Sequence, residues 1–149
     1  MSTRLTATAH DPIIASDGTH SIVCYQADQN ACVAVAATIA APATSVAITG
    51  TPVGIAYGSG GFVLAEGMAD NSGLLQRLDA DANPIGSPVA LPTLPLAAVA
   101  TSTGYAVASS DLHDGHLDIR TDRFDAQLQP VGSPTFYAHD ATSYVSLAA

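Results

Sequence analysis

The feature that most constrains the fold of this chain is an internal repeat. The stretch LDADANPIGSP returns later in similar form as FDAQLQPVGSP, so that Asp79 and Asp125 are 46 positions apart (125 − 79). Upstream of these stretches, Gly61–Phe62 corresponds in the same way to Gly104–Tyr105. A repeat with a period of this length is typical of a supersecondary unit that occurs in tandem and buries its apolar faces against its neighbours.

Each unit is predicted to contain four short strands. Apolar and β-branched runs alternate along the chain, Gly, Pro, Asn and Asp separate them, and no long segment has helical spacing. We therefore expect one all-β domain over residues 1–149, without any helix longer than about two turns. The predicted repeats cover approximately residues 10–50, 51–94 and 95–140, and the predicted partial units cover 1–9 and 141–149.

The repeated phrase has two interpretations, a calcium-binding loop or a structural turn. Asp79, Asp81 and Asn83 have the alternate spacing of calcium ligands. In the second copy, however, two of these three positions are glutamines, and Pro84 stands where a calcium loop needs glycine. Both copies keep an acid, a proline and Gly-Ser-Pro, which is turn chemistry. We therefore predict a hairpin turn.

The unit resembles the four-stranded blades of bacterial β-propeller repeats, whose copies read roughly Gly-Gly-Phe-Val-Val, then Gln-Arg-Phe-Asp-Ala, then Pro-Val-Gly. The resemblance implies three tandem propeller-like blades, either as an open arc or as part of a ring. The chain departs from the family at Glu66 and Ser109, where the family often carries tryptophan. The residues that match are Gly60, Gly61, Phe62, Val63, Leu64, Gln76, Arg77, Leu78, Asp79, Ala80, Pro84, Ile85 and Gly86, then Gly104, Tyr105, Arg123, Phe124, Asp125, Ala126, Pro130, Val131 and Gly132.

A β-trefoil is the alternative fold, because three four-stranded repeats of this length can close within one chain. The additional strands predicted at Thr3–Ala9 and Ser143–Ala148 do not fit the strand count of a trefoil. They fit an incomplete propeller, since closed propellers have at least about four blades and each blade must be covered by its neighbours. We therefore expect a homo-oligomer, with a dimer favoured, or a partner chain that completes the ring.

Composition excludes several classes of partner. The net charge is −9 and the chain has no lysine, so nucleic acid and anionic membrane surfaces are not expected partners. No run of residues is apolar enough to insert into a membrane, and the first residues do not resemble a signal peptide. The sequence indicates a soluble protein but not its compartment.

The two cysteines, Cys24 and Cys32, flank a short polar stretch. On paired strands they would come within disulfide range. Two cysteines are too few to indicate a disulfide scaffold, so we favour two buried free thiols.

Candidate functional residues lie in loops that share one rim in a blade arrangement. The segment from Asp111 to His116 combines carboxylates and imidazoles, which could hold zinc or another divalent metal, although Asp114–Gly115 also predicts a hairpin turn. The candidate ligand-binding residues are Tyr25, Glu66, Asp70, Asp111, His113 and His116, of which Asp111, His113 and His116 are the candidate metal ligands.

No repeated catalytic set is present, so the sequence favours a non-catalytic binding or assembly module that recognises a protein or a glycan through its rim loops. No cofactor is expected. The alternative is a metal-dependent hydrolase that uses the loop from Asp111 to His116.

Overall fold

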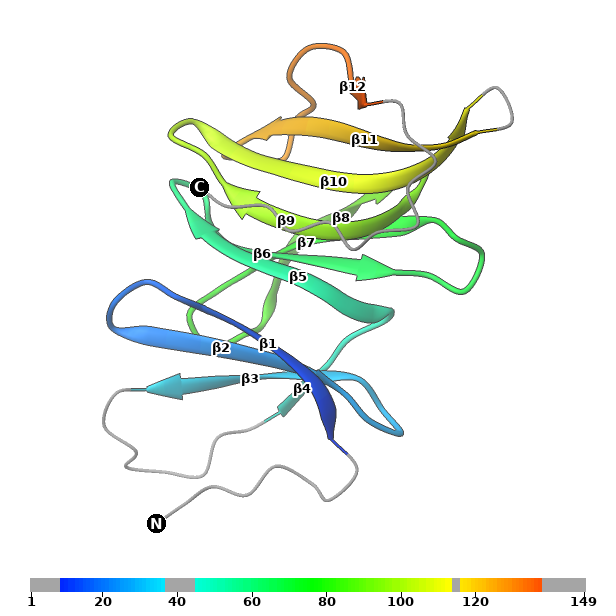
Figure 1. Cartoon of the computed structure of the whole chain (residues 1–149). Coiled ribbons are helices and arrows are strands. Elements are labelled where there is room, and N and C mark those ends of the chain that lie inside the picture. The colour runs from blue at the N-terminus through cyan, green and yellow to red at the C-terminus, as the bar shows by residue number, and fades with distance from the viewer. Residues whose placement is uncertain (1–8, 37–44, 114–115, 138–149) are drawn as a thin grey trace.

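The computed structural model describes residues 9–36, 45–113 and 116–137, which form three antiparallel four-stranded sheets and contain no helix (Figure 1). The predicted all-β arrangement of tandem four-stranded units is confirmed. Sheet 1 comprises β1 (His10–Ser16), β2 (His20–Gln26), β3 (Ala31–Ala36) and β4 (Ser45–Ala47). Sheet 2 comprises β5 (Thr51–Gly58), β6 (Gly61–Gly67), β7 (Gly73–Leu78) and β8 (Pro84–Leu91). Sheet 3 comprises β9 (Leu94–Ala100), β10 (Gly104–His113), β11 (His116–Asp125) and β12 (Thr135–Tyr137).

Each sheet is open, and its strands all come from one repeat. A β-trefoil would instead join strands from all three repeats in a closed barrel. The alternative fold is therefore not the one that the described residues adopt. The sheets are stacked so that the first strands β1, β5 and β9 follow one another in space (Figure 1).

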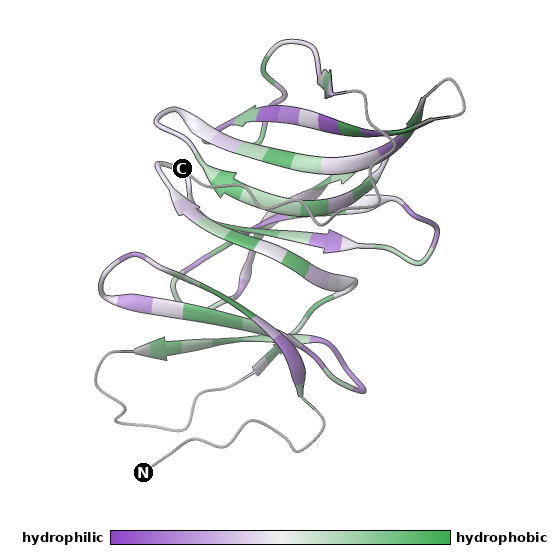
Figure 2. Cartoon of the chain, viewed as in Figure 1, coloured by the Kyte–Doolittle hydropathy of each residue, from purple (hydrophilic) through white to green (hydrophobic). Residues whose placement is uncertain are grey.

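The middle sheet is covered on both faces. The run Phe62-Val63-Leu64-Ala65 on β6 is fully buried, although successive side chains of a strand point in opposite directions. Phe62 and Leu64 pack towards sheet 1 with Ile22, while Val63 and Ala65 pack towards sheet 3. A strand buried on both sides needs a continuous apolar run instead of an alternating one. Figure 2 shows apolar (green) stretches along the strands of all three sheets.

The repeated phrase forms the same turn in sheets 2 and 3. Oδ1 of Asp79 accepts hydrogen bonds from the backbone N–H groups of residues 81 and 83, at 2.9 and 2.8 Å. Oδ1 of Asp125 accepts the equivalent bonds from residues 127 and 129, at 2.9 and 2.8 Å. Ala82 and Leu128 take the same left-handed conformation, with φ of 67° and 64°. The prediction of a hairpin turn is confirmed.

The junction of sheets 2 and 3 explains why glycine stands at position 60. The hydroxyl of Tyr105 on β10 donates a hydrogen bond to the carbonyl oxygen of Gly61, at 2.7 Å. Arg77 donates to the carbonyl oxygen of Gly60, at 3.0 Å. A side chain at Gly60 would collide with the backbone of Ala126 in sheet 3, so only glycine fits there.

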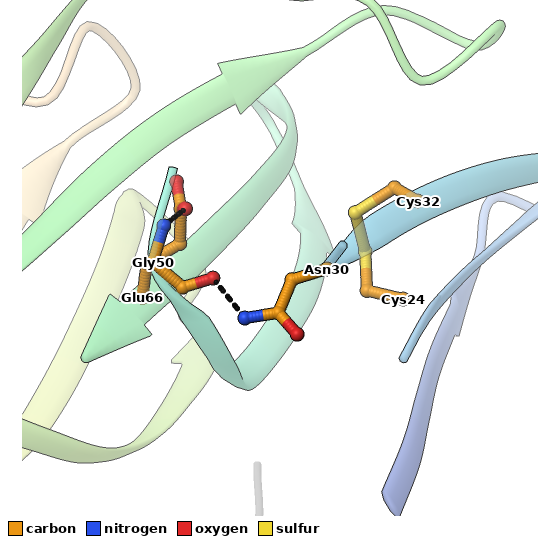
Figure 3. Close-up of a disulfide and its surroundings, with 5 residues drawn as sticks. All are labelled: Cys24, Asn30, Cys32, Gly50 and Glu66. Atoms are coloured by element: carbon orange, nitrogen blue, oxygen red, sulfur yellow. Dashed lines mark hydrogen bonds between the residues drawn. A yellow bond between two sulfur atoms is a disulfide. The ribbon is translucent and has the colours of Figure 1, made fainter. Parts of the chain in front are cut away.

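The preference for free thiols was wrong. Cys24 and Cys32 occupy directly opposite positions on β2 and β3 and form a disulfide, with their Cα atoms 4.0 Å apart (Figure 3). Both are completely buried on the face of sheet 1 that packs against sheet 2. Sequence spacing could not decide this point, because it does not give the register of the two strands.

Some predictions concern residues that the structure does not describe. The strands expected at Thr3–Ala9 and Ser143–Ala148 and the turn at Asp114–Gly115 lie wholly or almost wholly outside the described residues. Within the described part of the chain, no helix is long and apolar enough to cross a membrane.

Candidate functional site

The loops that join β2 to β3 and β6 to β7 emerge on the same side of the molecule as the end of β10 (right in Figure 1). In sheet 1 this loop covers residues 27–30, and in sheet 2 it covers residues 68–72. In sheet 3 the pairing of β10 with β11 continues to His113 and His116. The six candidate residues therefore lie at or near the corresponding strand ends of three different sheets, along one rim.

Tyr25 lies at the end of β2, opposite Ala31 on β3. It is only 6% exposed and belongs to a small apolar cluster with Ala31 and Val33 on the face of sheet 1 that points away from sheet 2. The structure thus places its ring in an apolar layer and not on a loop surface.

Glu66 is buried at the junction of sheets 1 and 2. Its carboxylate accepts a hydrogen bond from the backbone N–H of Gly50, at 2.6 Å, and the side-chain amide of Asn30 donates to the carbonyl oxygen of Gly50, at 2.9 Å (Figure 3). Burial raises the pKa of Glu66 above its ordinary value, although the backbone N–H groups of Gly50 and Thr49 oppose this by stabilising the charged form. Glu66 therefore holds the segment that connects the two sheets. Asn30, which sequence reasoning missed, does the same from sheet 1.

Asp70 is exposed in the loop between β6 and β7. Its carboxylate accepts hydrogen bonds from the hydroxyl of Ser72, at 2.5 Å, and from the backbone N–H of Ser72, at 3.1 Å. These two bonds lower the pKa of Asp70, because both stabilise the charged form. Asp70 is the one candidate of this hairpin that faces solvent.

Asp111 lies near the end of β10 beside a strong ion pair. Arg120 donates two hydrogen bonds to Asp122, at 2.7 and 2.8 Å, and its Nη1 is 3.7 Å from Oδ2 of Asp111. Asp122 is the main cause of the raised pKa of Arg120. The Arg120 guanidinium also lies 5.9 Å from the ring centroid of Phe136, as a cation–π contact.

His113 and His116 are paired with each other at the ends of β10 and β11. Their side chains lie outside the described part of the structure. The hairpin interpretation agrees with this pairing, because the two strands are in register up to the residues that flank 114–115.

Asp118 is a residue that the candidate set omitted. It stands directly opposite Asp111 across β10 and β11, and it is only 6% exposed. Its Oδ1 is buried without a hydrogen-bond partner, and so is the hydroxyl oxygen of Ser109 on the same face of sheet 3. The signal in the sequence was the two-residue alternation of strands around a hairpin, which puts Asp111 and Asp118 in register once the turn is fixed at 114–115.

Comparisons with known proteins gave no match, either to a family model, to a curated protein or to a solved structure. Within the described side chains, no group of three or more His, Cys, Asp and Glu residues is placed to hold a metal ion.

Proposed function

We propose that this protein is a non-catalytic binding and assembly module that pairs with a second copy of itself through the outer face of sheet 3. The observation that carries the proposal is an apolar patch of Leu112, Leu117, Ile119 and Tyr137, called here the Leu112 patch. Leu112 is opposite Leu117, and Ile119 is opposite Tyr137, so the four side chains are contiguous on three adjacent strands. Leu112 is 73% exposed and Tyr137 is 58% exposed. Contiguous exposed apolar side chains mark interaction sites.

The rest of this outer face favours a contact limited to the Leu112 patch. Strand register makes Ala106 the equivalent of Val63 and Thr121 the equivalent of Leu75. Val63 and Leu75 are core residues that pack against sheet 3, whereas their equivalents in sheet 3 are smaller or polar. In tandem repeats, a polar outer face is typical of the terminal unit. These residues support a two-fold dimer over a ring that continues from sheet 3 with a partner chain.

The rim loops are the surface that we propose for a further protein or glycan partner. Asp28 and Asp70 are exposed in two of these loops, on sheets 1 and 2. Together with the charge of −9, they favour a partner with hydrogen-bond donors or positive charge.

Light scattering on the purified chain tests the dimer. The double variant Leu112→Ser/Leu117→Ser removes the facing leucine pair of the Leu112 patch, and we expect it to be monomeric where the unmodified protein is dimeric. Ile14→Ser is the matched control, because Ile14 is 64% exposed on sheet 1, away from the patch. We expect this control to remain dimeric.

The dimer should also respond to salt. Two copies that each carry −9 repel one another, and salt screens this repulsion. We therefore expect the dimer to become stronger as the salt concentration rises. A wild-type protein that is monomeric at high micromolar concentration, or a double variant that still dimerises, would contradict the proposal.

A further inference from the structure

We propose that the carboxylates of Asp111 and Asp118 form a binding site for a divalent metal ion at the end of the β10–β11 hairpin. The two residues are directly opposite each other in an unbroken antiparallel register that extends from Gly104–Asp125 to His113–His116. Directly opposite residues share one face of a sheet, with their Cβ atoms about 4.5–5.5 Å apart. Two carboxylates can therefore bind the same ion from both strands.

This face of sheet 3 carries more carboxylates than guanidinium groups. Two like charges placed directly opposite each other destabilise a sheet. Arg120 lies on the same face, but Asp122 already accepts two of its N–H groups. Three carboxylates thus share this face with a single guanidinium, which also forms a longer ion pair with Asp111, with Nη1 3.7 Å from Oδ2. Asp111 can turn towards an ion by giving up this longer contact, while the Arg120–Asp122 pair stays in place.

The burial of Asp118 supports the metal site independently of the charge on this face. The residue is 6% exposed, and its Oδ1 has neither a hydrogen-bond donor nor an ion-pair partner within the described structure. A buried ionised carboxylate is costly unless it is paired or coordinates a metal. The hydroxyl of Ser109, one residue pair further along the same face, is also buried and unpartnered, and it is a further oxygen ligand. The side chain of Asp111 is 23% exposed, which gives an ion a path from solvent.

The chemistry of the ligands decides which ion the site prefers. A site made only of oxygen ligands prefers Ca²⁺ or Mn²⁺, whereas imidazole ligands favour Zn²⁺. The same two carboxylates are needed in either case.

Calorimetric titration of the chelator-treated protein with Ca²⁺, Mn²⁺ and Zn²⁺ tests the site. We expect one ion per chain, and we expect Asp118→Asn to weaken binding by at least about tenfold, because even residues that only orient metal ligands are worth that much. Asp11→Asn is the matched control, at an aspartate whose side chain is 73% exposed on sheet 1. It removes one exposed carboxylate from a different sheet and should leave the affinity within about twofold of wild type, as expected for distant sites.

Two further measurements complete the test of the metal site. Circular dichroism establishes that Asp118→Asn is folded, and Asp111→Asn, at the more exposed position, replaces it if it is not. If the protein prefers Zn²⁺ and the double variant His113→Ala/His116→Ala loses this preference, the imidazoles also bind the ion. If the protein prefers Ca²⁺, only oxygen ligands bind it. The inference is overturned if none of the three ions binds, or if both aspartate variants leave binding unchanged. A bound water is then the partner of the Asp118 carboxylate.

Discussion

At the scale of single residues, position in the chain does not reveal which acidic side chains face solvent. Glu66 and Asp70 are four positions apart on one hairpin, yet the first is buried against Gly50 and the second is exposed in its own turn. The partner of Glu66 lies in the link between sheets 1 and 2, 16 residues earlier in the sequence. In the sequence, a polar residue that follows an apolar run suggests a functional site. The sequence alone does not show that such a side chain forms a hydrogen bond with a backbone group elsewhere in the fold.

We expect Glu66→Ala to lower the free energy of unfolding by about 2–4 kcal/mol, since it leaves the N–H of Gly50 unsatisfied and opens a small cavity. Asp70→Ala removes a carboxylate of the same hairpin that makes only exposed bonds, so we expect a much smaller loss. Urea unfolding at neutral pH measures both. Equal losses for the two variants would show that burial of Glu66 is unimportant.

The pH dependence of Glu66 has a definite sign. Burial raises the pKa of its carboxyl in the folded protein above the ordinary value of 4.5. The folded state therefore holds this proton more tightly than the unfolded state, so the contribution is fully present below the unfolded pKa and is lost as the pH rises through the folded pKa. We expect wild type to lose stability relative to Glu66→Gln as the pH rises from below 4.5 towards neutrality. Unfolding curves of both proteins across this range provide the check, and a constant difference would contradict the raised pKa.

At the scale of the elements, the sequence predicted the three four-stranded units and the repeated turn because both depend on local patterns. Short apolar runs define the strands, and an acid followed by proline and glycine defines the turn. The disulfide depends instead on the register of β2 and β3, and the opposition of Asp111 and Asp118 depends on the register of β10 and β11. Register is set by the complete sheet, so these features emerged only from the structure.

The repeated turn allows a test with an internal control. Asp79→Ala and Asp125→Ala each remove two hydrogen bonds to backbone N–H groups, so we expect each to lower stability by about 1–2 kcal/mol. Asp81→Ala should have little effect, because its exposed side chain makes no bond in this turn. If Asp81→Ala is as damaging as Asp79→Ala, or if added calcium stabilises the wild type but not Asp81→Ala, the calcium-loop interpretation returns.

The disulfide should contribute measurably to sheet 1. It closes a loop with a sequence separation of 8 residues, for which chain entropy gives about 2–3 kcal/mol. We expect Cys24→Ser/Cys32→Ser to unfold at a correspondingly lower denaturant concentration and to be insensitive to reductant. Reduced wild type should resemble this variant, and unchanged stability on reduction would mean that the two sulfurs are not joined in solution.

At the scale of the whole molecule, the three sheets are unequally protected. Sheet 2 is covered by sheet 1 on one face and by sheet 3 on the other, whereas β4 and β12 are three-residue outer strands. We expect the amides of β6 to exchange with solvent most slowly and those of β4 and β12 to exchange fastest. Hydrogen exchange followed by NMR measures this order, and uniform rates would show that the sheets open together.

The strand order within the sheets has a consequence for how the chain is made. Every strand pairs only with its immediate neighbour in sequence, and the links between sheets are as short as residues 48–50 and 92–93. Strand pairing within a sheet therefore does not wait for the later sheets, because all four strands of each sheet come from one repeat. Sheet 1 has all its partners, including both of its cysteines, before sheet 3 has been translated. We expect the nascent chain to acquire native structure sheet by sheet as it leaves the ribosome, with each finished sheet serving as the template against which the next one packs.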